Sequence, residues 1–168
     1  MPHFMQPLRD EHQELLPHIK QIRTVADAIG TSPVASLRQD INETYEFLRH
    51  HLIPHAQAEE QALYPVVGNL MGAPEATATM SHDHVEIGRL IEELGTLRLY
   101  LNKESLGPSQ EQALRRVLYG LSALITVHFA KEEEVYVPLL EARLTPTEAH
   151  HLFESMEQAA HEAKSVVR

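Results

Sequence analysis

The chain contains no cysteine, no tryptophan and only 7 glycines among its 168 residues. Without cysteine it forms no disulfide, holds no iron–sulfur cluster through thiolates and has no thiol nucleophile. Because glycine is scarce and 43% of the residues are hydrophobic, a disordered or turn-rich chain is excluded. The length predicts one domain, residues 1–168, that is large enough for a sizeable core.

Positive charge and long apolar runs are also scarce. The 14 Lys and Arg residues face 24 Asp and Glu residues, which gives a formal net charge of −10 at pH 7. Nucleic acids and anionic membrane surfaces repel such a chain, so we expect neither as a partner. No segment approaches the apolar length of a membrane span, and the N-terminal residues MPHFMQPLRDEH do not resemble a secretory signal. These features predict a cytoplasmic protein.

In contrast, the sequence has 12 histidines, and several of them lie in a motif that occurs twice. Residues 55–65 read HAQAEEQALYP and residues 128–138 read HFAKEEEVYVP. In each copy a His is followed four residues later by Glu, five later by a second Glu and ten later by Pro. The repetition predicts two related halves.

A shorter pair of motifs precedes these copies: DEHQELL around His12 and HDHVEIG around His84. His84 follows His12 by 72 residues (84 − 12), and His128 follows His55 by 73 (128 − 55). The chain therefore consists of two copies of one helical pair, each with two His and at least one carboxylate. Six of the eight histidines outside this pattern are predicted to be solvated surface residues: His3, His18, His50, His150, His151 and His161.

Apolar residues recur every three to four positions, and this periodicity predicts an all-α fold. The expected helices cover about residues 7–30, 34–64, 74–102, 109–142 and 145–167. Short connections between the first four favour an up-down-up-down four-helix bundle with a core of residues 8–142, and the C-terminal helix lies across or alongside it. We expect Pro65 to bend or end the second helix, residues 68–76 to link the halves, and Val135 to face the core.

Each copy of the motif has one His and one Glu placed so that both can bind the same metal ion. Residues four apart on a helix differ by about 40° around the axis, so His55 with Glu59, and His128 with Glu132, each offer a nitrogen and an oxygen to one point. His12 and His84 fall on the apolar faces of their own helices. Burying six polar groups costs several kcal/mol unless they are satisfied, and two metal ions would satisfy them.

The types of donor atom indicate which metal ions the site would prefer. Four imidazoles and two carboxylates inside a helical bundle favour iron, with manganese or zinc as alternatives. A zinc-protease site is not indicated, because the order is H-x-x-x-E and no H-E-x-x-H occurs. The predicted metal ligands are His12, His55, Glu59, His84, His128 and Glu132.

This set of residues, one group per helix in this order, resembles the hemerythrin-like, or HHE cation-binding, family over about residues 8–140. The trailing Tyr64-Pro65 and Tyr136-Val137-Pro138 are also similar to that family. The resemblance implies a centre of two non-haem iron ions, joined by Glu59 and Glu132 and by an oxo or hydroxo group. It also implies reactivity toward small diatomic molecules or peroxide at an open iron position.

The chain departs from the oxygen-carrying members of the family, which have five His and two carboxylates. They have a second His four residues along the third helix, where this chain has Gly88, and His82 is predicted to point elsewhere. His51, one turn before His55, is an alternative source of the fifth nitrogen. In the carriers the last carboxylate lies five residues after its His, at the place of Glu133 here, but the matching spacing of Glu59 favours Glu132.

Three functions are compatible with the sequence. A missing His opens coordination at iron and favours reaction with dioxygen, peroxide or nitric oxide over reversible storage. The alternative is iron or oxygen sensing, iron handling or repair of iron centres without turnover; sensors usually have an output domain, and repair-type members carry a Cys-bearing segment. A metal-free bundle for protein interaction would tolerate Ala or Leu at all six ligand positions.

Overall fold

The computed structural model describes residues 4–166, and these form helices and short connections with no strand among them. The first helix of the bundle is α1 (Gln6–Ala28). The second is continuous from Val34 to Met71 and contains α2 (Val34–Phe47), α3 (Ile53–Ala58) and α4 (Tyr64–Met71). The third contains α5 (Ala78–Leu97), and the fourth contains α6 (Pro108–Lys131) and α7 (Val137–Arg143). The last helix is α8 (Pro146–Val166).

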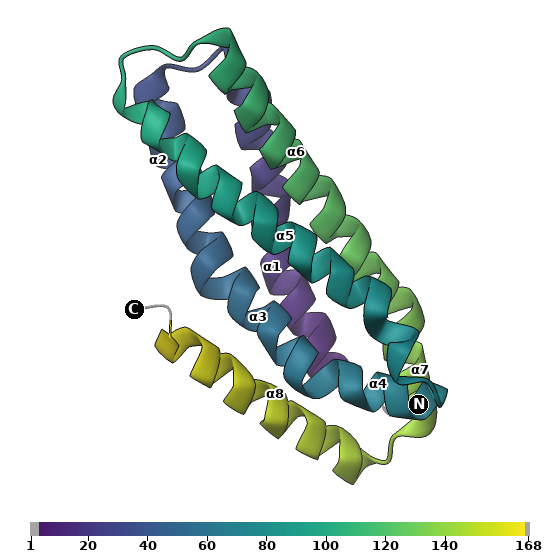
Figure 1. The fold of residues 1–168 in the computed structure, drawn as a ribbon. Coiled ribbons are helices and arrows are strands. Elements are labelled where there is room, and N and C mark those ends of the chain that lie inside the picture. The colour runs from purple at the N-terminus through teal and green to yellow at the C-terminus, as the bar shows by residue number, and fades with distance from the viewer. Residues whose placement is uncertain (1–3, 167–168) are drawn as a thin grey trace.

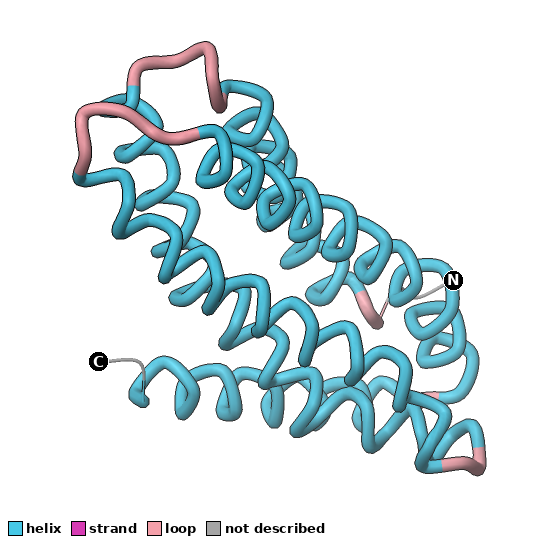
Figure 2. The backbone as a smooth tube through the Cα atoms, turned by 45° about the horizontal axis from the view of Figure 1, so that its top comes forward, coloured by secondary structure: helices cyan, strands magenta, loops and turns pink. Residues whose placement is uncertain are grey.

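The four long helices run up, down, up and down, as predicted (Figure 1). Within the bundle α1 packs against α2 and α6, and α5 packs against α6. Helix α8 lies along the outside of α3 in both views (Figure 2). Its buried residues Leu152, Met156 and Ala159 join Leu63 and Val67 in one apolar cluster, so α8 covers its own bundle. None of the described helices combines the length and the apolarity that a membrane crossing requires.

The second helix extends beyond its predicted end. A π-helical turn, Glu59–Leu63, directly precedes Tyr64 and Pro65. Its last backbone hydrogen bond is donated by Tyr64 N–H to the Glu59 carbonyl five residues back. This wider turn accommodates a proline, which has no N–H and would clash with the carbonyl four residues before it. The helix therefore continues to Met71 and ends at Gly72, whose φ of 69° closes it in the left-handed conformation. The linker between the halves is correspondingly shorter than predicted.

Two further π turns, Leu48–Leu52 and Glu132–Tyr136, also lie just before a proline. The second of these corrects another prediction, because Val135 is 52% exposed whereas Tyr136 is buried. A π turn adds one residue to the turn, so the inward position moves on by one residue. The prediction from the sequence assumed an α-helical period throughout and therefore missed this shift.

The core has two apolar parts with a polar layer between them. On α1, for example, Leu8 belongs to one apolar cluster, Leu15 belongs to the other, and His12 lies between them in sequence. On α5, Met80 and Ile87 flank His84 in the same way. Burial of each Leu, Ile or Met side chain contributes roughly 1.5–3 kcal/mol, so the apolar clusters can offset the cost of placing polar groups between them.

Candidate metal centre

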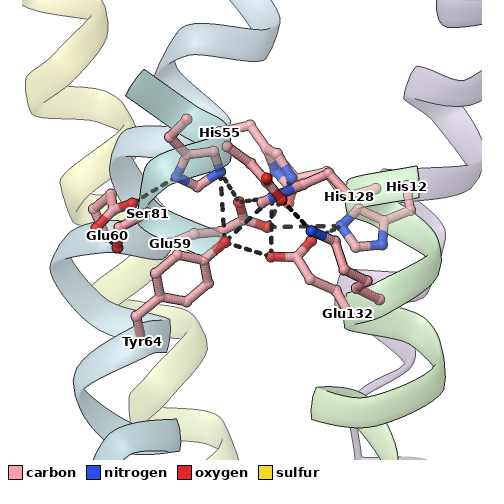
Figure 3. A network of polar contacts seen from close by, with 12 residues as sticks. His12, His55, Glu59, Glu60, Tyr64, Ser81, His128 and Glu132 are labelled. Atoms are coloured by element: carbon pink, nitrogen blue, oxygen red, sulfur yellow. Dashed lines mark hydrogen bonds and ion pairs between the residues drawn. The ribbon is translucent and has the colours of Figure 1, made fainter. Parts of the chain in front are cut away.

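The six residues predicted to bind metal meet in one cluster inside the bundle (Figure 3). They come from α1, α3, α5 and α6 and from the first residues of two π turns: His12, His55, His84, His128, Glu59 and Glu132. Both Glu side chains are fully buried, and the side chain of His84 is 9% exposed. The structure therefore brings all six together, as the doubled spacing predicted.

Glu59 lies between two pairs of imidazoles. Its Oε1 is 2.9 Å from His55 Nε2 and 3.7 Å from His12 Nε2. Its Oε2 is 3.2 Å from His84 Nε2 and 3.9 Å from His128 Nε2. One carboxylate thus presents one oxygen to each His pair, which is the arrangement that a bridging ligand requires.

Glu132 is placed in a similar way at the other side of the cluster. Its Oε2 lies 3.3 Å from His12 Nε2, and its Oε1 lies 3.4 Å from His128 Nε2. Donor atoms that lie within 4.8 Å of one another form two groups, one of His12, His55, Glu59 and Glu132 and one of Glu59, His84 and His128. We call these the first and the second donor group.

Several inward atoms of the cluster have no hydrogen-bond partner among the described residues. They are His12 Nε2, His55 Nε2, both oxygens of Glu59 and Glu132 Oε2. An unpaired buried polar atom costs about 1–3 kcal/mol, and more where the group is charged. Bound cations would satisfy all of them at once, and imidazole with carboxylate suits iron, manganese or zinc. The residues present therefore fit a metal centre.

Each imidazole of the cluster also contacts an outer carboxylate through its Nδ1 atom. His12 Nδ1 lies 2.7 Å from Glu133, and His84 Nδ1 lies 2.7 Å from Glu60. The other two contacts are 3.0 Å long, from His55 Nδ1 to Glu11 and from His128 Nδ1 to Asp83. Metal-bound imidazoles generally have such partners, which fix the tautomer with Nε2 toward the metal.

The sequence interpretation treated Glu60 and Glu133 as solvated groups or as neighbours of the ligands, but it missed Glu11 and Asp83. An acidic residue, Glu11 or Asp83, directly precedes His12 or His84, and a second Glu directly follows Glu59 and Glu132. The doubling therefore extends to these four positions, although it does not say which imidazole each one meets. Glu60 and Glu133 are 37% and 31% exposed in their side chains and contact an imidazole from outside the cluster.

One tyrosine adds a hydroxyl to the cluster. The Tyr64 hydroxyl donates a hydrogen bond of 2.8 Å to Glu132 Oε1 and lies 3.2 Å from His128 Nε2. It also lies 3.5 Å from His84 Nε2, so it stands at the second donor group. Burial and the nearby negative charges of Glu59 and Glu132 raise the pKa of Tyr64 far above its ordinary value, so the phenol keeps its proton.

The charges in the metal-free cluster compensate one another. Burial by itself lowers the pKa of His12 and His128, but the attraction of the nearby carboxylates of Glu132 and Glu59 outweighs burial. The pKa is raised to about 9 for His12 and to about 10 for His128. Burial raises the pKa of Glu59, but the neighbouring imidazoles, His55 foremost, hold it well below 4.5. Positive charge on the imidazoles thus balances the buried carboxylates, and metal cations can take the place of those protons.

The remaining histidines among residues 4–166 lie away from the cluster. His51 is exposed and stacks on Phe47 with 5.7 Å between the ring centres, so it does not supply a fifth nitrogen. His82 is exposed, as predicted. The predicted surface residues His18, His50, His150, His151 and His161 are all exposed, and His3 lies outside the described residues.

Comparison with known proteins agrees with this geometry. The family model described as "Hemerythrin HHE cation binding domain" matches residues 3–140. The chain belongs to this family. The match spans the four long helices up to residue 140 and all six residues of the His and Glu cluster, so the hemerythrin domain of this chain is a cation-binding helical bundle. No curated protein and no solved structure matches the chain.

Proposed function

We propose that this hemerythrin domain binds two iron ions and reacts with small oxidants: dioxygen, peroxide or nitric oxide. One ion is held by His12 and His55 and the other by His84 and His128, with Glu59 and Glu132 shared between them. The observation that carries the proposal is the position of the two buried carboxylates, each of which has one oxygen near each His pair. Membership in a cation-binding family supports it.

The protein's own groups orient and charge the donors. Outer carboxylates hold the Nδ1 side of all four imidazoles, which leaves each Nε2 lone pair directed inward and more basic. The Tyr64 hydroxyl donates a hydrogen bond to Glu132 Oε1 and thereby orients that carboxylate. Apolar clusters on either side of the layer keep bulk water away and strengthen these interactions.

A cavity beside the second donor group supports reaction rather than storage alone. It reaches Glu59, His84 and His128, so a metal there has room for an external molecule. When bound, the iron pair would supply the electrons that reduce an oxidant. The chain's contribution is to keep that position open and surrounded by fixed hydrogen-bonding groups.

The test begins with metal content per chain and the optical spectrum of the aerobically purified protein. We expect about two irons per chain with near-ultraviolet charge-transfer absorption, and consumption of peroxide or nitric oxide once a chemical reductant has converted the ferric iron of the purified protein to the ferrous state. The double variant Glu59→Gln/Glu132→Gln should lose both, whereas Glu92→Gln, an exposed residue on α5, should lose neither. Absence of iron after growth and reconstitution in iron would refute the proposal. Iron without either reaction would leave binding in place and favour sensing or iron handling.

A further inference from the structure

The two halves of the chain differ in the residues that flank their matching histidines. One turn after His12 lies Leu16, and one turn after His84 lies Gly88. The residue that follows His55 is Ala56, and the residue that follows His128 is Phe129. The half of the cluster beside α1 therefore has two large side chains where the half beside α5 has two small ones.

Phe129 covers the first donor group. Its ring stacks on that of His12 with centres 4.4 Å apart and an angle of 13°, and it meets His55 edge-on at 5.7 Å. The side chain is buried. A surface hollow of about 390 Å³ beside Arg9 and Leu16 reaches His12, but its lining includes neither Glu59 nor His55. Phe129 lies in its wall and separates it from the inner carboxylate.

The equivalent position in the other half is open. A Cβ atom placed on Gly88 would meet no described heavy atom within 4 Å. A cavity of about 210 Å³ lies beside Gly88 and Ala56 and reaches Glu59, His84 and His128, all three members of the second donor group, together with His55 of the first. The ring of Phe129 forms part of its wall as well, so Phe129 lies between this cavity and the hollow on the α1 side. The rest of its wall is mostly apolar, formed by residues such as Leu52, Ile87 and Ile125.

We propose that small uncharged molecules reach the cluster through the cavity between Gly88 and Ala56, and that Phe129 closes the opposite side. Cavities of about 150 Å³ lined by aliphatic and aromatic side chains bind benzene, so this one is large enough for molecules from a diatomic gas up to a single aromatic ring. Gly88 and Ala56 thus determine how large a molecule can reach the cluster. The proposal rests on the proposed function for the metal at the inner end, and on the cavity alone for access.

The test uses two probes on the purified full-length chain. Fluorobenzene, followed by fluorine NMR, reports on the cavity, and nitric oxide, followed by stopped-flow absorbance, reports on access to the iron-loaded cluster. We expect Gly88→Leu to abolish fluorobenzene binding and to slow nitric oxide binding by at least about tenfold, because the added side chain enters the cavity beside His84.

Matched variants separate closure from other effects. Gly88→Ala makes the same improvement in helix propensity with a single methyl group and should keep both probes bound. Ala56→Phe places in this half the residue that closes the other, so it should reproduce the effect of Gly88→Leu by a different wall. Phe129→Ala, combined with Gly88→Leu, should restore nitric oxide binding, because Phe129 lies in the walls of both this cavity and the hollow on the α1 side. Circular dichroism and thermal melting confirm that each variant folds.

The two probes also separate this proposal from the function it rests on. Binding of fluorobenzene to Gly88→Leu as tightly as to the wild type would overturn the access route, and so would absence of fluorobenzene binding in the wild type. Unchanged nitric oxide kinetics in both closing variants would overturn it as well. If the chain takes up no iron, the proposed function fails, but the fluorobenzene result still decides whether the cavity is the open side.

Discussion

His12 and His84 hold equivalent places in the two halves of the chain, yet their surroundings differ. Each has its Nδ1 atom 2.7 Å from an outer Glu carboxylate and its Nε2 atom directed at the inner carboxylates. The ring of Phe129 covers His12, whereas a cavity borders His84. Groups that would hold a metal are therefore the same in both halves, and groups that control access are not.

A second difference lies one turn beyond the carboxylates. Tyr64, nine residues after His55, donates a hydrogen bond from its hydroxyl to Glu132, while the residue nine after His128 is Val137. The Tyr64 hydroxyl and the cavity both lie at the second donor group, so the cluster has one closed and one open side. The following predictions test how far the donors are equivalent and where the difference begins.

The largest effect is expected from the inner carboxylates. Glu59 faces all four imidazoles, whereas Glu132 faces His12 and His128. Glu59→Gln should lower metal affinity at both positions by more than ~100-fold, beyond the effect of losing an outer partner. Glu132→Gln should lower it less. Metal content by mass spectrometry after dialysis measures both. Equal retention by the two variants would show that Glu59 does not have the central role.

The outer carboxylates should give the next largest effect and should act alike in the two halves. Glu60→Gln and Glu133→Gln each weaken an acceptor at the Nδ1 of one imidazole, so metal affinity should fall about 10–100-fold in each. The measurement is competition with a chelator of known affinity, and Glu92→Gln serves as the exposed control. A large loss in one variant alone would extend the asymmetry from access to metal binding.

The order of the helices and the convergence of the six predicted ligands could be predicted because both depend on periodicity. Apolar spacing specifies which face of a helix is buried, and His55 and Glu59 share a face at any reasonable helix geometry. Predictions failed where the backbone leaves the α-helical period. The π turn at Glu132–Tyr136 exposes Val135, and the one at Glu59–Leu63 carries the helix past Pro65.

The cavity and the outer contacts depend on distances between helices, which one sequence does not contain. Gly88 could be recognised as a missing ligand, but the space beside it follows from how Ala56 and the apolar residues of three helices pack. The partner of each imidazole likewise lies on a different helix, as with His55 and Glu11. Spacing within one helix therefore predicts which residues face inward, and the packing decides what they meet.

A pH dependence of intermediate size should appear in both halves, through His12 and His128. In the metal-free protein their pKa values of about 9 and about 10 lie above the ordinary 6.5, so both imidazoles are protonated at pH 7. Metal must displace these protons, and its affinity should rise up to about tenfold per pH unit for each proton displaced, until pH passes about 10. Chelator competition at several pH values measures this slope.

The same groups predict the opposite trend for the stability of the metal-free protein. A pKa raised by folding contributes stability that is complete below pH 6.5 and is lost as pH rises through about 9 and about 10. Urea denaturation should therefore give a lower free energy of unfolding at pH 10 than at pH 7, and His12→Gln should reduce the difference. Metal-free protein that becomes more stable over this range would contradict the assigned charges.

The smallest effect should come from the tyrosine that distinguishes the open half. Tyr64→Phe removes the hydroxyl that donates to the buried Glu132 Oε1, and a hydrogen bond to a charged group contributes about 1.5–3 kcal/mol. Tyr136→Phe is the matched control, because its ring meets Tyr64 edge-on and no hydrogen bond is recorded for its hydroxyl among residues 4–166. Urea denaturation of the metal-free variants should show a loss for Tyr64→Phe and little change for Tyr136→Phe. Equal losses would place the contribution in ring packing, and the two ends of the cluster would then differ in access alone.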